Sequence, residues 1–350
     1  MRIRALHRFR NIFTLPRERR FIVHIRRLGV RLLESLFIIF CIITINFVLI
    51  RFMPGDPVMH IIGEDEYFRL ESAYPEVIEE VRAEYGLDQP LLTQYLTYLD
   101  KILHLDFGNS YRIKTPVLDT VLFRMQWTLL LAIPAILLSA LIGGFLGLCA
   151  GWNRGGIADT VASTVMMVIN TIPSNALAII FLLVFAFRMG KFPISGITSG
   201  GLTGTARTID ILWHMVLPLS VLVLLRSSSY FMLMKSTVQS IKDEEYVTVA
   251  RGKGFTDGEV QRRHVLKNAL CPYITSVCMQ FGQILGGSML VEVVFSWKGM
   301  GTLIYDSVNT KDFPMLQTCF LFIGICIVAF NLLADVLNML IDPRTRREVP

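Results

Sequence analysis

The sequence predicts an all-α membrane protein with six transmembrane helices. Of its 350 residues, 53% are apolar and only 18% are charged, and the mean hydropathy is +0.53. This apolar content exceeds the amount that a soluble domain of the same length needs for its core. Apolar stretches long enough to cross ~30 Å of hydrocarbon recur along the chain. Basic segments, rich in Lys and Arg, occur at every second connection between these stretches, as the positive-inside bias predicts for the cytoplasmic side.

Five stretches have the length and composition of a span, and a sixth carries one charge, Arg226. That charge lies near one end of its stretch, where its long stem reaches the membrane surface. The six predicted spans are Leu32–Ile50, Gln126–Trp152, Thr160–Phe187, Ile211–Met234, Cys271–Trp297 and Leu316–Ile341.

Charge sets the expected orientation in the cell membrane. Residues 1–31 hold ten Arg and one acid, Glu18, so this basic N-terminal tail belongs in the cytoplasm. With six spans, the run 235–270 and the tail 342–350 also fall inside. Residues 51–125 then form an extracellular segment, in which thirteen acids outnumber seven bases.

Motifs for chemistry are missing from the sequence. No GxxxxGK[ST], HExxH or GxSxG occurs, the six His are scattered singly, and the six Cys lie in or next to apolar stretches. We therefore expect no catalytic, cofactor or metal site, and a transported substrate becomes the leading idea. Energy for active transport would have to enter through another protein.

One charged run, residues 243–270, is the conspicuous cytoplasmic surface. Asp243 is predicted to cap a short helix through Ala250, and Gly252 and Gly254 are predicted to end it with left-handed backbone. Thr256 and Glu259 then form a capping box for a second helix toward Leu270. Seven Lys or Arg lie between positions 235 and 267. The run is either a docking surface or a solvated basic loop.

This run also carries a family resemblance. Tyr246–Gly254, followed by Arg263-His264, Asn268-Ala269-Leu270 and Pro272, resembles the coupling loop of ABC-importer permeases of the oligopeptide/dipeptide/nickel family. Blocks similar to the B-type subunit of that family occur in the same order: Pro54–Pro57, Gly86–Pro90, Asp106–Ser110, Val291-Glu292, Phe295–Trp297, Gly299, Gly301 and Asp312–Pro314. Thr248-Val249, His264 and Lys267 depart from the general importer signature, so only the peptide-branch pattern is satisfied.

The resemblance implies a type I ABC importer permease fold and a role in the uptake of peptides. Implied partners are a second homologous permease subunit, two ABC ATPase subunits that bind the ATP, an extracellular solute-binding protein and membrane lipid, with no nucleic acid. Nickel or another small solute stays open as substrate. An ion-gradient-driven secondary transporter or channel predicts paired repeats and midplane acids, which the sequence does not show. The absent catalytic cluster disfavours a membrane-bound enzyme.

A coupling loop must convert a movement of the ATPase into a tilt of the membrane helices. A short helix held by a glycine turn can seat in a groove on that ATPase through apolar and charged contacts. The residues expected to do so are Tyr246, Val249, Ala250, Arg251, Lys253 and Gly254.

Six residues within the spans are candidates for the pathway or its gating. Pro173 and Pro218 are predicted to interrupt the third and fourth spans, either beside a water-lined path or as simple packing kinks. Asn175 follows the first of them. Glu292 and Asp335 are intramembrane acids, explained equally by gating or by hydration at the interface. Arg226 either snorkels or, if buried, pairs with an acid such as Asp335. The candidates are Pro173, Asn175, Pro218, Arg226, Glu292 and Asp335.

Two further expectations concern packing. Gly143, Gly147 and Gly151 recur every four residues, as do Gly282 and Gly286, which gives smooth helix faces for close approach. The acidic surplus of residues 51–125 and the amphipathic run Pro75–Tyr85 predict a folded cap that meets the binding protein.

Overall fold

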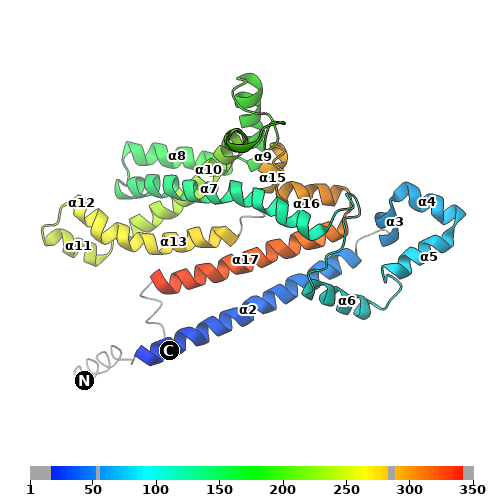
Figure 1. The fold of residues 1–350 in the computed structure, drawn as a ribbon. Coiled ribbons are helices and arrows are strands. Elements are labelled where there is room, and N and C mark those ends of the chain that lie inside the picture. Colours follow the sequence, from blue (N-terminus) through cyan, green and yellow to red (C-terminus); the bar gives the residue numbers. More distant parts are fainter. Residues whose placement is uncertain (1–16, 53–55, 283–287, 342–350) are drawn as a thin grey trace.

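The computed structural model describes residues 17–52, 56–282 and 288–341, and every regular element in these ranges is a helix (Figure 1). One isolated bridge, between Asn109 and Pro116, is the only extended pairing in the same ranges. The predicted all-α class is therefore confirmed.

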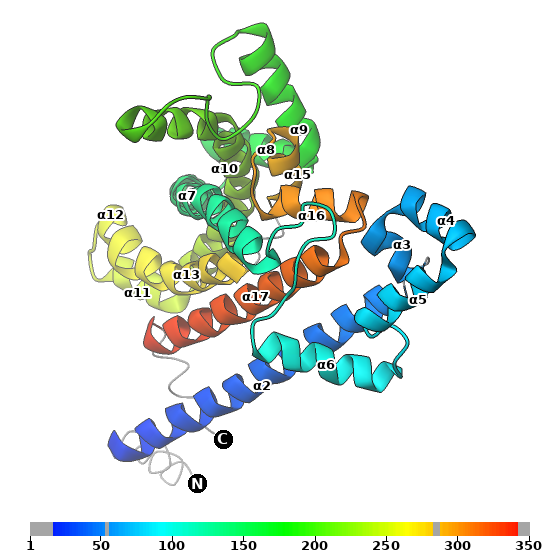
Figure 2. The ribbon, with the colours of Figure 1, turned by 45° about the vertical axis from the view of Figure 1, so that its right-hand side comes forward.

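The centre of the bundle is a pair of long helices, α7 (Val117–Trp152) and α10 (Gly204–Lys242), which pack along each other. On one side of them lie α13 (Lys267–Gly282) and then α17 (Phe313–Ile341). The outermost helix is α2 (Arg17–Arg51), which contacts α17 (Figures 1 and 2). The order α7/α10, α13/α17 and α2 therefore defines the layers of the protein.

Four described helices contain segments long and apolar enough to cross a membrane: Gly29–Leu49, Val117–Trp152, Gly204–Lys242 and Phe313–Val336. A fifth crossing requires the bent pair Ile157–Thr171 and Ser174–Arg188 to act as one span. The predicted span Cys271–Trp297 includes residues 283–287, which lie outside the described ranges. Its described parts are α13 and the short α15 (Met289–Val294). The count of six spans stays a prediction.

The two intramembrane prolines behave differently. At Pro173 the chain bends by 100° between α8 (Ile157–Thr171) and α9 (Ser174–Phe181), which continues as η2 (Leu182–Arg188). Ile172, just before this proline, takes the extended backbone that a residue preceding proline favours. At Pro218 the expected interruption is wrong, because α10 is continuous. Pro218 is buried in this helix, which packs along α7, and tertiary packing can outweigh the local cost of a proline.

The glycine face of α7 is where α10 approaches. A Cβ added at Gly143, Gly147 or Gly151 would lie 2.5, 2.6 or 2.8 Å from a main-chain oxygen of α10. These oxygens belong to Ser227, Phe231 and Lys235, again four residues apart. Backbone therefore meets backbone, and no side chain fits between. Gly286, of the second glycine pair, lies outside the described residues.

The segment between α2 and α7 is folded. It contains α3 (Pro57–Ile62), α4 (Glu64–Ala73), α5 (Pro75–Glu84) and α6 (Leu91–Leu103). Asp56 joins the first three: its carboxylate accepts hydrogen bonds from the Val58 N–H at 2.9 Å, the Tyr67 hydroxyl at 3.1 Å and the Arg82 guanidinium at 2.8 Å. The amphipathic run predicted from Pro75 is α5.

We predict that Gly147→Ala destabilises the protein by about 1–3 kcal/mol, because the added methyl overlaps the Phe231 carbonyl and forces α7 and α10 apart. The unfolding midpoint of the detergent-solubilised protein measures this. Gly29→Ala is the matched control, since it lies in a helix with no atom within 4 Å of the added Cβ. Equal midpoints for the two variants would contradict the close approach.

Candidate functional site

The charged run forms two helices joined by a turn, at the end of the bundle opposite α3–α5 and α16 (Met300–Asn309) (Figures 1 and 2). The first is α11 (Glu245–Gly252), and the second begins as α12 (Asp257–Val260) and continues through η3 (Gln261–Leu266) into α13. The predicted cap and end of the first helix are wrong. Asp243 directly follows α10 as its C-cap and keeps helical backbone, so Glu244 is the N-cap of the next helix, and α11 runs past Ala250 to Gly252.

The turn depends on one glycine rather than two. Gly254 has a φ of +87°, a region that favours glycine, whereas Gly252 lies inside α11. The predicted capping box is confirmed: the Thr256 N–H donates to Glu259 Oε2 at 3.1 Å, and the Glu259 N–H donates to Thr256 Oγ1 at 3.4 Å. Backbone hydrogen bonding from Thr256 also lowers the pKa of Glu259.

Helix α11 has an inner and an outer face. Val247 and Ala250 are buried in a cluster with residues of α10 and α13. Tyr246 and Val249 face outward, with 37% and 55% of their surfaces exposed. Ala250 therefore positions the helix, while the outer face presents apolar side chains.

A tryptophan that the sequence analysis missed ties α11 to the long helices. Trp152, at the C-terminal end of α7, has the Lys242 ammonium 4.9 Å and the Arg251 guanidinium 5.6 Å from its ring centroid. Lys242 also donates to the Trp152 carbonyl at 2.5 Å. Cation–π contacts thus link α7, α10 and α11. A Trp at the end of an apolar span, two residues before Arg154, was the available signal.

A second link, also missed, ties α8 to α10. The Lys235 ammonium lies 2.5 Å from the Asp159 carboxylate and donates to Ser163 Oγ at 2.6 Å. The Asp159 side chain is only 7% exposed, so partial burial strengthens this pair relative to a surface salt bridge.

Glu292 is fully buried, so hydration at the interface does not explain it. Its Oε1 accepts hydrogen bonds from Thr128 at 2.9 Å and Ser288 at 2.8 Å, and its Oε2 accepts one from the Gly301 N–H at 2.8 Å. A Cβ at Gly299 or Gly301 would lie 2.4 or 2.9 Å from Oε2. The glycines therefore make room for a carboxylate that joins α15, α16 and α7.

The expected pair of Arg226 and Asp335 does not form. Arg226 Nη1 donates to Gln280 Oε1 at 3.4 Å, whereas Asp335 lies 3.5 Å from Arg31 Nε. The reason is the order of layers: α13 lies beside α10, and α2 lies beside α17. Both Arg31 and Asp335 are more than a third exposed, so this ion pair contributes little stability.

The proline candidates lie in contrasting places. Pro173 and Asn175 are exposed at the bend between α8 and α9, and Pro218 is buried within α10. Arg226 lies on α10 with Pro218, whereas Glu292 lies on α15 and Asp335 on α17, so the candidates are spread over four helices.

Two blocks distant in sequence meet beside α16. Asp312 accepts a hydrogen bond from the Ser110 hydroxyl, and main-chain N–H groups of Tyr111 and Arg112 donate to it at 3.3 and 3.5 Å. The Asp106–Ser110 and Asp312–Pro314 blocks of the sequence analysis are thereby joined.

The bundle, its helical loop at one end and its folded segment at the other define a multi-pass helical membrane protein. Family comparison supplies its role: the family model described as "Binding-protein-dependent transport system inner membrane component" matches residues 140–347. The N-terminal model of the membrane component of such systems matches residues 20–132. The chain belongs to this family and is a permease subunit of an ABC importer.

Curated relatives cover nearly the whole chain. A putative peptide transport system permease protein of Brucella abortus (strain 2308) is 29% identical over 316 residues, covering 90% of this chain and 97% of the relative. The glutathione transport system permease protein GsiC of Escherichia coli (strain K12) is 32% identical over 317 residues, with the same coverage. A crystal structure of an amino acid ABC transporter with histidines has 18% identity and a TM-score of 0.49, covering 63% of this chain and 94% of that chain.

We predict that Glu292→Ala lowers the unfolding midpoint strongly, because the buried Gly301 N–H loses its acceptor at a cost of about 1–3 kcal/mol. Glu292→Gln retains one acceptor oxygen for that N–H and a donor toward the Thr128 and Ser288 hydroxyls, so its midpoint stays close to that of the wild type. Thermal unfolding of both variants in detergent measures the difference. A Gln variant as unstable as the Ala variant would show that the carboxylate charge itself is required.

Proposed function

We propose that this chain forms the translocation pathway for di- or oligopeptides in an ABC importer. The relatives named for peptide and glutathione transport support this substrate class, since glutathione is itself a small peptide. Nickel or another small solute is the alternative within the family.

The observation that carries the coupling role is the two-faced helix α11. Its inner residues, Val247 and Ala250, are fixed on the bundle, while Tyr246 and Val249 remain available to another protein. Arg251 and Lys253 add positive charge beside them. We propose that this face seats on an ABC ATPase and that Trp152 transmits the movement to α7 and α10.

The proposed complex contains a second homologous permease, two ATPase subunits and an extracellular solute-binding protein. ATP is bound by the ATPase subunits, and this chain supplies no ATPase site and no cofactor. The N-terminal tail 1–31, the loop 235–270 and the tail 342–350 lie in the cytoplasm, and residues 51–125 lie outside, in accord with the charge bias. There α3–α6 form the cap that meets the binding protein.

Uptake by the complete complex in proteoliposomes tests the substrate and the energy source together. We expect ATP-dependent uptake of labelled peptides, unaffected by nickel in excess and abolished by a catalytically inactive ATPase subunit. Uptake driven by an ion gradient without ATP hydrolysis would identify a secondary transporter instead.

The coupling role predicts a specific effect of Gly254→Asp: normal membrane insertion but loss of most peptide uptake. A residue with a Cβ resists the φ of +87° by about 1–2 kcal/mol, and the new acid disturbs the basic surface. Uptake and co-purification of the ATPase are measured side by side.

Two variants separate charge from backbone strain. Gly258→Asp adds the same acid in the same loop, at a glycine without positive φ and with no neighbour within 4 Å of its Cβ, so uptake should persist. Gly254→Asn tolerates the left-handed backbone better and should be intermediate. Full uptake by Gly254→Asp would show that this turn takes no part in coupling.

A further inference from the structure

Helix α6, in the segment before α7, carries a stripe of exposed leucines. Leu92, Leu96 and Leu103 are 70%, 56% and 81% exposed, and Leu99 completes the spacing i, i+4, i+7, i+11. This spacing puts all four on one side of the helix. No described residue covers the three exposed side chains.

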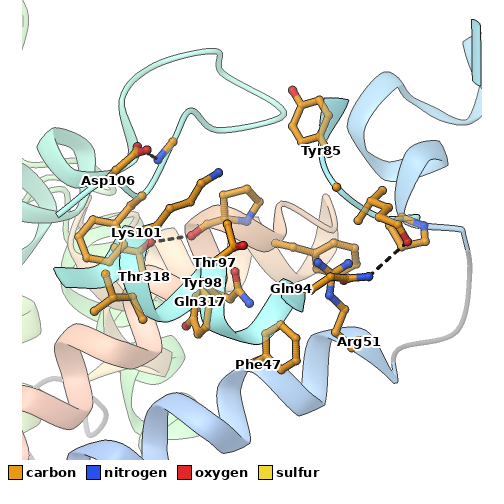
Figure 3. Close-up of a pocket in the computed structure, with 18 of the residues that line it drawn as sticks. Phe47, Arg51, Tyr85, Gln94, Thr97, Tyr98, Lys101, Asp106, Gln317 and Thr318 are labelled. Atoms are coloured by element: carbon orange, nitrogen blue, oxygen red, sulfur yellow. Dashed lines mark hydrogen bonds between the residues drawn. The ribbon is translucent and has the colours of Figure 1, made fainter. Parts of the chain in front are cut away.

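The opposite side of α6 is polar. Gln94, Thr97 and Lys101 line a cleft of about 660 Å³, together with residues of α2 and α17 such as Arg51 and Gln317 (Figure 3). The helix therefore separates a polar cleft from an apolar surface.

The contacts between α6 and α2 indicate how deep α6 lies relative to the membrane surface. The Tyr95 hydroxyl lies 2.7 Å from Thr44 Oγ1, and the rings of Tyr95 and Tyr98 lie 5.2 and 5.6 Å from that of Phe47. The apolar sequence of α2 continues beyond Thr44 to Ile50, just before Arg51, and these six residues span about 9 Å at 1.5 Å per residue. Amphipathic helices at a membrane surface lie at this depth, about 5–10 Å into the boundary of headgroups and acyl chains.

The apolar surface also continues onto α2. Val48 and Leu49, at the same end of that helix, and Phe52, directly after it, are 42%, 59% and 76% exposed. Because this part of α2 belongs to a segment long and apolar enough to cross a membrane, we expect its exposed apolar side chains to face lipid. The tyrosines of α6 match the aromatic residues that gather where a membrane meets water.

We propose that α6 lies in the membrane interface, with its leucine stripe (Leu92, Leu96, Leu99 and Leu103) inserted among phospholipid acyl chains and its polar cleft facing water. In the orientation proposed above, this is the outer leaflet. The bilayer thus contacts the membrane side of the cap formed by α3–α6. Only the choice of leaflet rests on that orientation.

Photo-crosslinking in the complete importer, reconstituted in nanodiscs of phosphatidylethanolamine and phosphatidylglycerol with the binding protein added, tests the proposal. The photoreactive residue p-benzoylphenylalanine replaces Leu92, Leu96 or Leu103 in turn, and mass spectrometry identifies the adduct. We expect lipid adducts at all three positions.

Two control positions make every outcome decisive. Leu49 of α2 should give lipid adducts and calibrates the yield, whereas Asp100, an exposed residue of α6 outside the stripe, should give at least tenfold less. Crosslinks from the leucine positions to the second permease or to the binding protein would overturn the proposal, since a protein would then cover the stripe. Yields at the leucine positions no higher than at Asp100 would overturn it as well, because the stripe would face water.

Discussion

The structure depends on the close approach of two backbones. Where α7 and α10 meet, the glycines of one helix face main-chain oxygens of the other, so the two helices behave as one unit. The other elements attach to this pair. Lys235 and Asp159 hold α8, Trp152 holds α11, and the Trp297 indole donates to the Trp127 carbonyl at 3.0 Å beside the start of α16.

This arrangement gives α7 contacts at both ends of the molecule. Trp152 meets α11 at one end, and Thr128 meets Glu292 at the other. The two positions are 24 residues apart, about 36 Å along a helix. A tilt of the pair α7 and α10 would therefore move α11 and the α15–α16 region together. Such rigid-body movement is how a shift at one protein surface reaches a distant one without a chain of local rearrangements.

The fold class, the capping box and the bend at Pro173 were predictable because each depends on residues close together in sequence. Apolar length requires helices in a membrane, Thr256 and Glu259 are three residues apart, and a proline restricts the residue just before it. The glycine spacing of α7 likewise indicated a smooth face. It did not say which helix would lie there.

What the sequence by itself determined is thus the helical membrane class, the family resemblance and the capping box of the charged loop. Only the tertiary structure decided which distant residues meet. In the folded protein Glu292 is buried among hydroxyl and N–H donors, and Asp335 pairs with Arg31 rather than with Arg226. Helix α10 is continuous through Pro218, and the Trp152 ring contacts Arg251 of α11. The physical reason is that these outcomes follow from the order in which helices pack side by side. Helical periodicity defines the face of the helix on which each residue lies, but it does not define which other helix packs against that face.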